Sequence, residues 1–254
     1  MKVRKRDEIA CYFVQYNNNI YLDYNIIVTK VSSEDINNNM EGVIIDTDNQ
    51  RAPLKATSEQ LMQMLQCIEN DILPKTSVSV ANHGNKVFGA AILDKNFKCI
   101  FADTNTETDC PIFHGEVKCI YAWSQATPAK DRGHIAQSSI FLSTHEPCCM
   151  CISSILWAGF NTVYYFFPYT ITSSQGIPHD IATMHELWGV SSYRKQNKYL
   201  STACIMEMIA AMEEGEDKRL LTELQNKLLE RYDKLSMKYH SEKASNENNS
   251  LVLG

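Results

Sequence analysis

The sequence predicts an α/β domain, because helical and strand-like segments alternate over its central part. The order indicated by hydrophobic periodicity is helix, β-hairpin, helix, strand, helix, strand. This pattern is typical of a sheet covered by helices. We divide the chain into an N-terminal β-rich extension (1–55), a central domain (56–200), a C-terminal helical segment (201–240) and a flexible tail (241–254).

The N-terminal extension predicts short strands. Residues 8–31 alternate loosely between apolar and polar side chains, with Asn17–Asn19 placed like a turn between two strands. Val43–Ile45 is another strand candidate. At Thr57 a capping residue opens a helix with apolar side chains at helical spacing, which we expect to end at Pro74.

The central domain continues with a hairpin and then alternates helices with strands. A turn at 94–96 separates two apolar runs, Val87–Leu93 and Lys98–Ala102. The later elements, in chain order, are a helix over His114–Trp123, a strand over Ser139–Ser143, a helix from Pro147 to Gly159 and a strand over Val163–Phe167.

Residues 204–240 carry leucines at helical spacing, namely Leu221, Leu224, Leu228 and Leu235. This stripe predicts an amphipathic helix that packs on the core of its own domain or on a second copy of the chain. The polar stretch SEKASNENNS after it is predicted to be solvated.

The composition narrows the class of protein. The chain has 254 residues, 44% of them hydrophobic, which suits one substantial core. No apolar run approaches the roughly 18–20 residues of a membrane span, and the N-terminus shows no secretory signal, so we expect a cytoplasmic protein. The net charge of −6 disfavours non-specific nucleic-acid binding. The nine cysteines are expected to be reduced thiols or metal ligands.

Two short strings combine into a metal-binding pattern. His114 and Glu116 form H-x-E in CPIFHGEVKCI, and Cys148 and Cys151 form P-C-x-x-C in HEPCCMCISSI. Two thiols three residues apart project from one face of a first helical turn, and the histidine adds a third ligand. Such a set leaves one tetrahedral position of Zn²⁺ open for a water molecule, whose pKa the metal lowers. Glu116 would carry protons from that water to the substrate, and the combined pattern is the signature of zinc-dependent nucleobase deaminases.

Each half of this pattern alone is less specific. A redox dithiol formed by Cys148 and Cys151 is an alternative, but it leaves His114 and Glu116 without a role. Cys149, inside the motif, is expected to be a packed thiol that points away from the metal.

Over residues 57–190 the chain resembles the cytidine deaminase-like superfamily, and more narrowly its branch of guanine deaminases and tRNA-wobble adenosine deaminases. Besides the H-x-E string, the resemblance rests on Phe88-Gly89-Ala90, on Asn105 ahead of the histidine, and on Thr144-His145-Glu146-Pro147-Cys148 followed by Met150-Cys151. It implies a three-layer αβα fold on a five-stranded mixed sheet, often in a homodimer. It also implies that Asn105 forms a hydrogen bond with the substrate.

Three further positions bear on the substrate. Asp180 lies beyond the last predicted strand, where guanine deaminases carry substrate-contacting acids, so it is either a contact of a ring amine or a surface residue. His145 is expected to line the pocket or the edge of the sheet. The branch usually has alanine where this chain has Gly115, which costs up to about 1 kcal/mol of helix propensity and could make room for a bulkier substrate.

These observations predict a zinc-dependent hydrolytic deaminase that converts an amino group on a nucleobase, nucleoside or related heterocycle to a carbonyl and releases ammonia. One alternative is a deaminase that acts on a base within tRNA or single-stranded nucleic acid. Its phosphate contacts would come from basic residues, namely Arg194, Lys195, Lys198, Lys2, Arg4, Lys5 and Arg6. Another alternative is a non-catalytic binding module stabilised by zinc, although the intact Glu116 argues against it.

Overall fold

The computed structural model describes residues 14–16, 19–21 and 50–247, and the chain forms two compact units, Met1–Asp46 and Thr47–Gly254. In the first unit, β1 (Val14–Tyr16) and β2 (Asn19–Tyr21) pair antiparallel. The hairpin expected around the asparagine cluster is therefore present. The strand expected at Val43–Ile45 lies outside the described residues.

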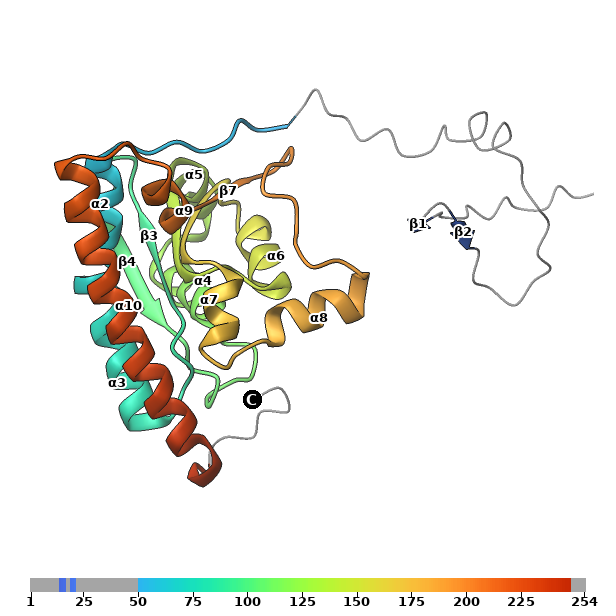
Figure 1. The fold of residues 1–254 in the computed structure, drawn as a ribbon, viewed down its shortest axis with the longest axis vertical. Coiled ribbons are helices and arrows are strands. Elements are labelled where there is room, and N and C mark those ends of the chain that lie inside the picture. Colours follow the sequence, from blue (N-terminus) through green and yellow to red (C-terminus); the bar gives the residue numbers. More distant parts are fainter. Residues whose placement is uncertain (1–13, 17–18, 22–49, 248–254) are drawn as a thin grey trace, which may run out of the picture. The chain divides into compact units, whose positions relative to one another are not determined.

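A mixed five-stranded sheet forms the centre of the second unit (Figure 1). Its strands, in spatial order, are β4 (Cys99–Thr104), β3 (Gly89–Leu93), β5 (Ile140–His145), β6 (Thr162–Phe167) and β7 (Ser201–Cys204). β3 pairs antiparallel with β4 and β5, whereas β6 pairs parallel with β5 and β7. The predicted fold class and the five-stranded mixed sheet are confirmed. The sequence analysis missed β7, since its four residues carry little hydrophobic signal.

One face of the sheet is covered by helices from both ends of the unit. These are α2 (Ser58–Cys67), the π-helical turn η2 (Ile68–Ile72), α3 (Leu73–His83), α9 (Ile205–Ala210) and α10 (Glu216–Glu242). Figure 1 shows α10 running along α2 and α3, and it packs against both. A short 3₁₀ turn, η3 (Lys243–Ser245), follows α10. The C-terminal helix therefore contributes to the core of its own unit.

The helix that begins after Thr57 is capped as predicted but ends later. The Thr57 side chain accepts a hydrogen bond from the Gln60 amide, and the Gln60 side chain accepts one from the Thr57 amide. Pro74 does not end the helical segment. It lies in the first turn of α3, directly after the π-turn η2, and the chain stays helical to His83.

The other face of the sheet is covered by α4 (Gly115–Ala126), α5 (Ala129–Ser138) and α6 (Cys149–Trp157); α7 (Tyr169–Ser174) and α8 (His179–Trp188) follow β6 in the chain. Pro147 was expected at the first position of α6, but Cys148 is its N-cap and Pro147 precedes the helix. The sequence analysis missed α5 because only one of its residues, Ala136, is buried, which leaves no hydrophobic period to detect.

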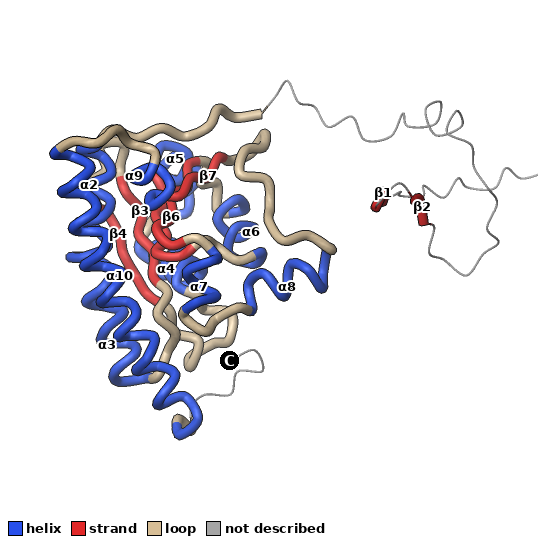
Figure 2. Tube along the Cα trace, viewed as in Figure 1, coloured by secondary structure: helices blue, strands red, loops and turns tan. Residues whose placement is uncertain are grey.

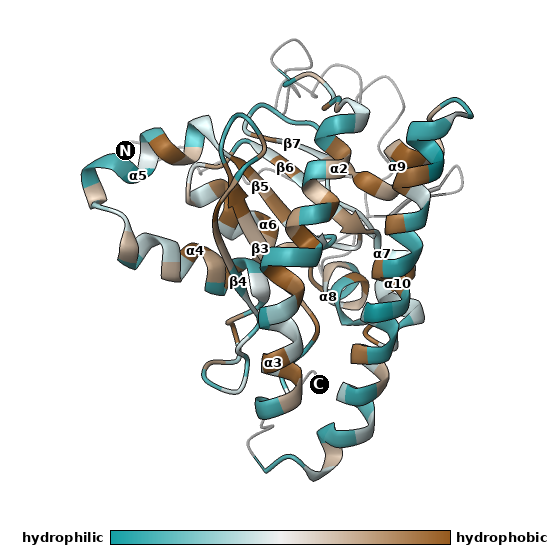
Figure 3. Cartoon of the chain, turned by 90° about the vertical axis from the view of Figure 1, so that its left-hand side faces the viewer, coloured by the Kyte–Doolittle hydropathy of each residue, from teal (hydrophilic) through white to brown (hydrophobic). Residues whose placement is uncertain are grey.

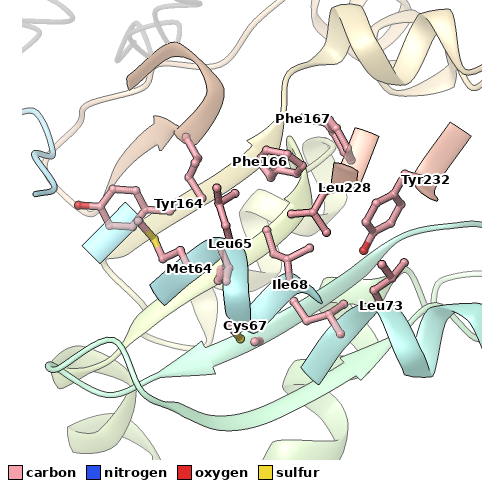
Figure 4. Packing of buried hydrophobic residues seen from close by; sticks show 14 of the residues in the cluster. Met64, Leu65, Cys67, Ile68, Leu73, Tyr164, Phe166, Phe167, Leu228 and Tyr232 are labelled. Atoms are coloured by element: carbon pink, nitrogen blue, oxygen red, sulfur yellow. The ribbon is translucent and has the colours of Figure 1, made fainter. Parts of the chain in front are cut away.

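Side-chain alternation along the strands builds a core on each face of the sheet. On β5, Leu142 belongs to the cluster under α2 and α10, and Phe141 to the cluster under α4 and α6. Figure 2 shows the strands enclosed by helices, and Figure 3 shows hydrophobic colour on the central strands and hydrophilic colour on much of α10. Leu228 and Tyr232 of α10 reach Phe166 and Phe167 of β6 in the first cluster (Figure 4).

Within the described part of the chain, no helix combines the length and the apolar character that a membrane span requires.

Candidate active site

The H-x-E and P-C-x-x-C strings meet where α4 and α6 begin. His114 is the N-cap of α4, Cys148 is the N-cap of α6, and Cys151 lies in its first turn. The ligand atoms of these three residues all lie within 4.8 Å of one another, and His114 Nδ1 is 3.6 Å from Cys148 Sγ. Two ligands of a tetrahedral Zn²⁺, one nitrogen and one sulfur, would be roughly 3.6 Å apart. One nitrogen and two thiol ligands at this spacing fit a zinc ion.

Glu107 fixes the orientation of the histidine ring. Its Oε1 atom lies 3.4 Å from His114 Nε2, so that Nε2 carries a proton and Nδ1 faces the thiols. The carboxylate is itself held by the Lys86 ammonium at 3.1 Å and by the Asn105 amide, which donates to Oε2 at 2.7 Å. A carboxylate on the far nitrogen of a metal-binding histidine sets the tautomer and raises the basicity of the ligand. Glu107 is therefore a positioning residue that the sequence analysis missed.

The ligand groups hold protons tightly when no metal is present. Burial alone would lower the pKa of His114, but hydrogen bonds with Cys148 and Glu107 raise it to about 11. Burial raises the pKa of the Cys151 thiol to about 12, and contact with Glu116 adds to the shift. A metal ion bound here takes the place of these protons, so its affinity increases with pH.

Glu116 is buried beside the ligand cluster and has a defined partner. It is 4% exposed, and Ser143 Oγ of β5 lies 2.9 Å from its Oε1 atom. The same Ser143 oxygen lies 2.6 Å from the backbone carbonyl of His145. The first turn of α4 thus places a carboxylate between the end of the central strand and the cysteines of α6.

Close packing of the backbone leaves no room for a side chain at Gly115. A Cβ atom at this position would lie 2.7 Å from Gly89 Cα, Gly89 N and Phe88 C, all of them backbone atoms of the β3 segment. Side chains do not approach backbone that closely, so any residue other than glycine would push the start of α4 away from β3. The expectation that this glycine makes room for a bulkier substrate is therefore replaced by a close contact between α4 and β3.

A cavity of about 370 Å³ opens onto the metal-ligand cluster. Apolar side chains, among them Phe88, Ile112 and Ile177, share its wall with a few polar groups that include Glu107 and Asp180. Asp180 lies in the first turn of α8, and burial raises its pKa to about 7. A mostly apolar cavity with a few convergent polar groups is typical of a small-molecule site.

Two of the predicted substrate contacts lie outside this cavity. Asn105 is fully buried, and its amide is engaged by Glu107 through two hydrogen bonds, at 2.7 and 3.0 Å. His145 ends the central strand rather than an edge strand, and its ring nitrogens face Thr144 and Gln175 at 3.0 and 3.1 Å. Contacts of Asn105 and His145 with a substrate stay predictions, whereas Asp180 does line the cavity.

Cys149 stays out of the three-ligand group, as expected for the residue inside the motif. It is half-buried, lines the cavity and lies 4.0 Å from Thr183 of α8. Its thiol is therefore only partly packed.

The basic residues proposed as phosphate contacts are only partly available. The Lys195 ammonium forms an ion pair with the buried Glu146 and lies 4.4 Å from the centroid of the Tyr193 ring. Lys198 lies over the ring of Tyr199 at 4.8 Å. The cluster at the N-terminus, Lys2, Arg4, Lys5 and Arg6, lies outside the described residues.

Comparison with known families agrees with the geometry of the site. Residues 59–167 match the family described as the cytidine and deoxycytidylate deaminase zinc-binding region. This part of the chain is therefore similar to that family, and the three-ligand group lies within the matched residues. The family match and the ligand geometry both indicate a zinc-binding site at His114, Cys148 and Cys151.

Solved structures show weaker similarity. A guanine deaminase from Nitrosomonas europaea is 14% identical with a TM-score of 0.40, covering 81% of this chain and 100% of its own. A guanine deaminase from Bacillus subtilis is 22% identical with a TM-score of 0.38, covering 48% and 79%. A structure from work on A-to-I editing by tRNA:A34 deaminases is 15% identical with a TM-score of 0.35, covering 59% and 94%. No curated protein matches the chain.

Proposed function

We propose that the protein is a zinc-dependent hydrolytic deaminase of a small amino-heterocycle, such as a free nucleobase or a nucleoside. The observation that carries the proposal is the position of the buried Glu116 beside the His114, Cys148 and Cys151 cluster, of which His114 and Cys148 line a cavity of about 370 Å³. When bound, zinc lowers the pKa of a water molecule in its open position toward 7. The side chains around it perform the proton transfers and hold the substrate.

Glu116 is the group that moves the proton. It takes one proton from the attacking water and delivers it to the ring nitrogen. It then takes the second proton from the new hydroxyl group and delivers it to the departing amine, so that ammonia leaves and a carbonyl remains. A purely structural metal site has no use for a buried carboxylate in this place. The intact Glu116 therefore supports catalysis over the alternative of a zinc-stabilised binding module.

Ser143 suits Glu116 in both of its protonation states. Its single hydroxyl proton can go to only one of the two acceptors it faces, Glu116 Oε1 at 2.9 Å or the His145 carbonyl at 2.6 Å. When Glu116 is ionised, Ser143 donates to the carboxylate. When Glu116 carries a proton, the acid donates to Ser143, and Ser143 turns its own proton to the carbonyl. Neither state leaves Glu116 without a hydrogen-bond partner, which is the property a proton carrier in a buried site requires.

Asp180 is the group we assign to substrate recognition. It lines the cavity from α8, and its pKa of about 7 allows it either to accept a hydrogen bond from an amine or ring N–H, or to donate one as the acid. The apolar walls, among them Phe88 and Ile112, suit the flat face of a heterocycle. The size of the cavity suits a base or nucleoside.

A substrate within a polynucleotide has less support. Its affinity would depend mainly on exposed basic residues. Lys195 is neutralised by Glu146, and the net charge of the chain is −6. These observations favour a small substrate. A gel-shift titration with tRNA and single-stranded DNA at low salt tests the point, and binding there would reverse the preference.

Ammonia release from a panel of guanine, cytosine, adenine, cytidine and deoxycytidine tests the proposed activity. We expect release from at least one member by the zinc-loaded protein, and a fall of at least about 100-fold in the Glu116→Gln variant. Glu186→Gln, an exposed substitution on α8, is the matched control and should keep full activity. The absence of release above the Glu116→Gln background from every member would contradict the proposal.

A further inference from the structure

A second group of metal-ligand side chains lies at the other end of β4 from the loop that carries His114. Cys67, the last residue of α2, meets Asp71 of η2 and Cys99, the first residue of β4. One ligand atom from each of the three lies within 4.8 Å of the other two. Two ligands of a tetrahedral Zn²⁺ would lie roughly 3.5–3.8 Å apart, so small side-chain rotations would complete the geometry.

Helical spacing and an irregularity of the strand pairing bring these residues together. Cys67 and Asp71, four positions apart on the continuous α2–η2 helix, lie on the same helix face. On the strand side, the pairing of β3 with β4 shifts register at Ile92/Leu93, and Leu93 pairs with Cys99. Such bulges re-aim side chains. Figure 4 shows the sulfur of Cys67 on the side of the helix that faces the strands.

The chemistry of the group suits a soft divalent cation. Cys67 is 5% exposed, Cys99 is half-buried and Asp71 is exposed, so that the thiols lie inside and the carboxylate faces solvent. Polar residues Asn70 and Asn96 line the surrounding groove, which leaves room for water as a fourth ligand.

We propose that Cys67, Asp71 and Cys99 form a second zinc site, which links the α2–η2 helix to the edge strand β4. It does not rest on the proposed deaminase reaction, because none of its residues lines the active-site cavity. With both thiols reduced, two thiols and a carboxylate with an open fourth position select zinc over magnesium or calcium, which prefer oxygen ligands.

The number of zinc ions per chain tests the site. The full chain, purified under reducing conditions and equilibrated with zinc, should hold two ions by atomic emission, and the Cys67→Ser/Cys99→Ser variant should hold one. When both proteins are loaded with cadmium, the thiolate-to-metal absorption of this double variant should be about half that of the parent protein, because two of the four thiolate ligands are lost. Cys204→Ser is the matched control, because its hydroxyl can keep the hydrogen bond to the Phe166 carbonyl, and it should hold two ions.

A second variant keeps the test decisive if the double variant fails to fold. Asp71→Asn changes an exposed side chain, and it should weaken binding of the second ion by at least about 10-fold while the first ion stays bound. Asp131→Asn on α5 is its control. One zinc per chain in the unsubstituted protein would overturn the proposal, and so would a Cys67–Cys99 disulfide, seen as a mass lower by two hydrogen atoms, in protein prepared with reductant.

Discussion

Replacing Gly115 by alanine tests the packing that positions the active site. The added Cβ would lie 2.7 Å from three backbone atoms of Phe88 and Gly89, whereas ordinary van der Waals contact begins near 3.4 Å. The N-terminus of α4 must therefore move away from β3 by about 0.7 Å. We expect the overpacking to cost about 1–3 kcal/mol, offset by less than about 1 kcal/mol from the better helix propensity of alanine.

The same shift displaces the residues on either side of Gly115. His114 and Glu116 move with the helix, and a displacement of about 1 Å in a catalytic constellation can reduce the rate by about 100-fold. We expect kcat to fall by about 10- to 100-fold and the free energy of unfolding to fall by about 1–2 kcal/mol, measured by ammonia release and by urea titration.

Gly133→Ala is the matched control for this experiment. Gly133 lies in α5 with no atom within 4 Å of its added Cβ, so alanine there should stabilise the protein by up to about 1 kcal/mol and leave kcat unchanged. If Gly115→Ala were as stable and as active as the parent protein, the close contact between α4 and β3 would not position the site.

Three further predictions follow from the contacts around the site. Glu107→Gln should lower zinc affinity by about 10- to 100-fold, measured by competition with a chelating dye, because the His114 ring loses its carboxylate; unchanged affinity would contradict that role. Ser143→Ala should lower kcat by about 10- to 100-fold with zinc content unchanged, and full activity would show that Glu116 needs no such partner. Burial lowers the pKa of His145 to about 4, below its ordinary value of 6.5, so the unfolded chain binds the extra proton and stability falls as pH drops through this window. From pH 7.5 to pH 5 the parent protein should lose about 2 kcal/mol more unfolding free energy than His145→Gln, and equal losses would refute the assignment.

Local sequence signals predicted the central strands of the sheet and the pair of cysteine ligands. The runs Val87–Leu93, Ser139–Ser143 and Val163–Phe167 correspond to β3, β5 and β6, because buried strands in the middle of a sheet are continuously apolar. The spacing of P-C-x-x-C indicated the cysteine pair, because residues three positions apart lie about one helical turn from each other. These features depend only on neighbours along the chain.

The remaining features depend on contacts between distant segments. Lys86, Asn105 and Glu107 meet around His114 only after β3 and β4 are paired, so no spacing rule connects them. Pro74 was expected to end the helix because the π-turn η2 directly before it has no strong sequence pattern, and Pro74 instead lies in the first turn of α3. In the second cluster, Cys67 and Cys99 are more than thirty positions apart and meet only across the packed helix and sheet.

The central claim is that Glu116 moves protons beside a zinc ion held by His114, Cys148 and Cys151. The most direct test compares the parent protein and Glu116→Gln in one assay, with zinc content and ammonia release measured on the same samples. We predict equal zinc content and a loss of release of at least about 100-fold in the variant. Equal rates of release from both proteins, at equal zinc content, would contradict the claim.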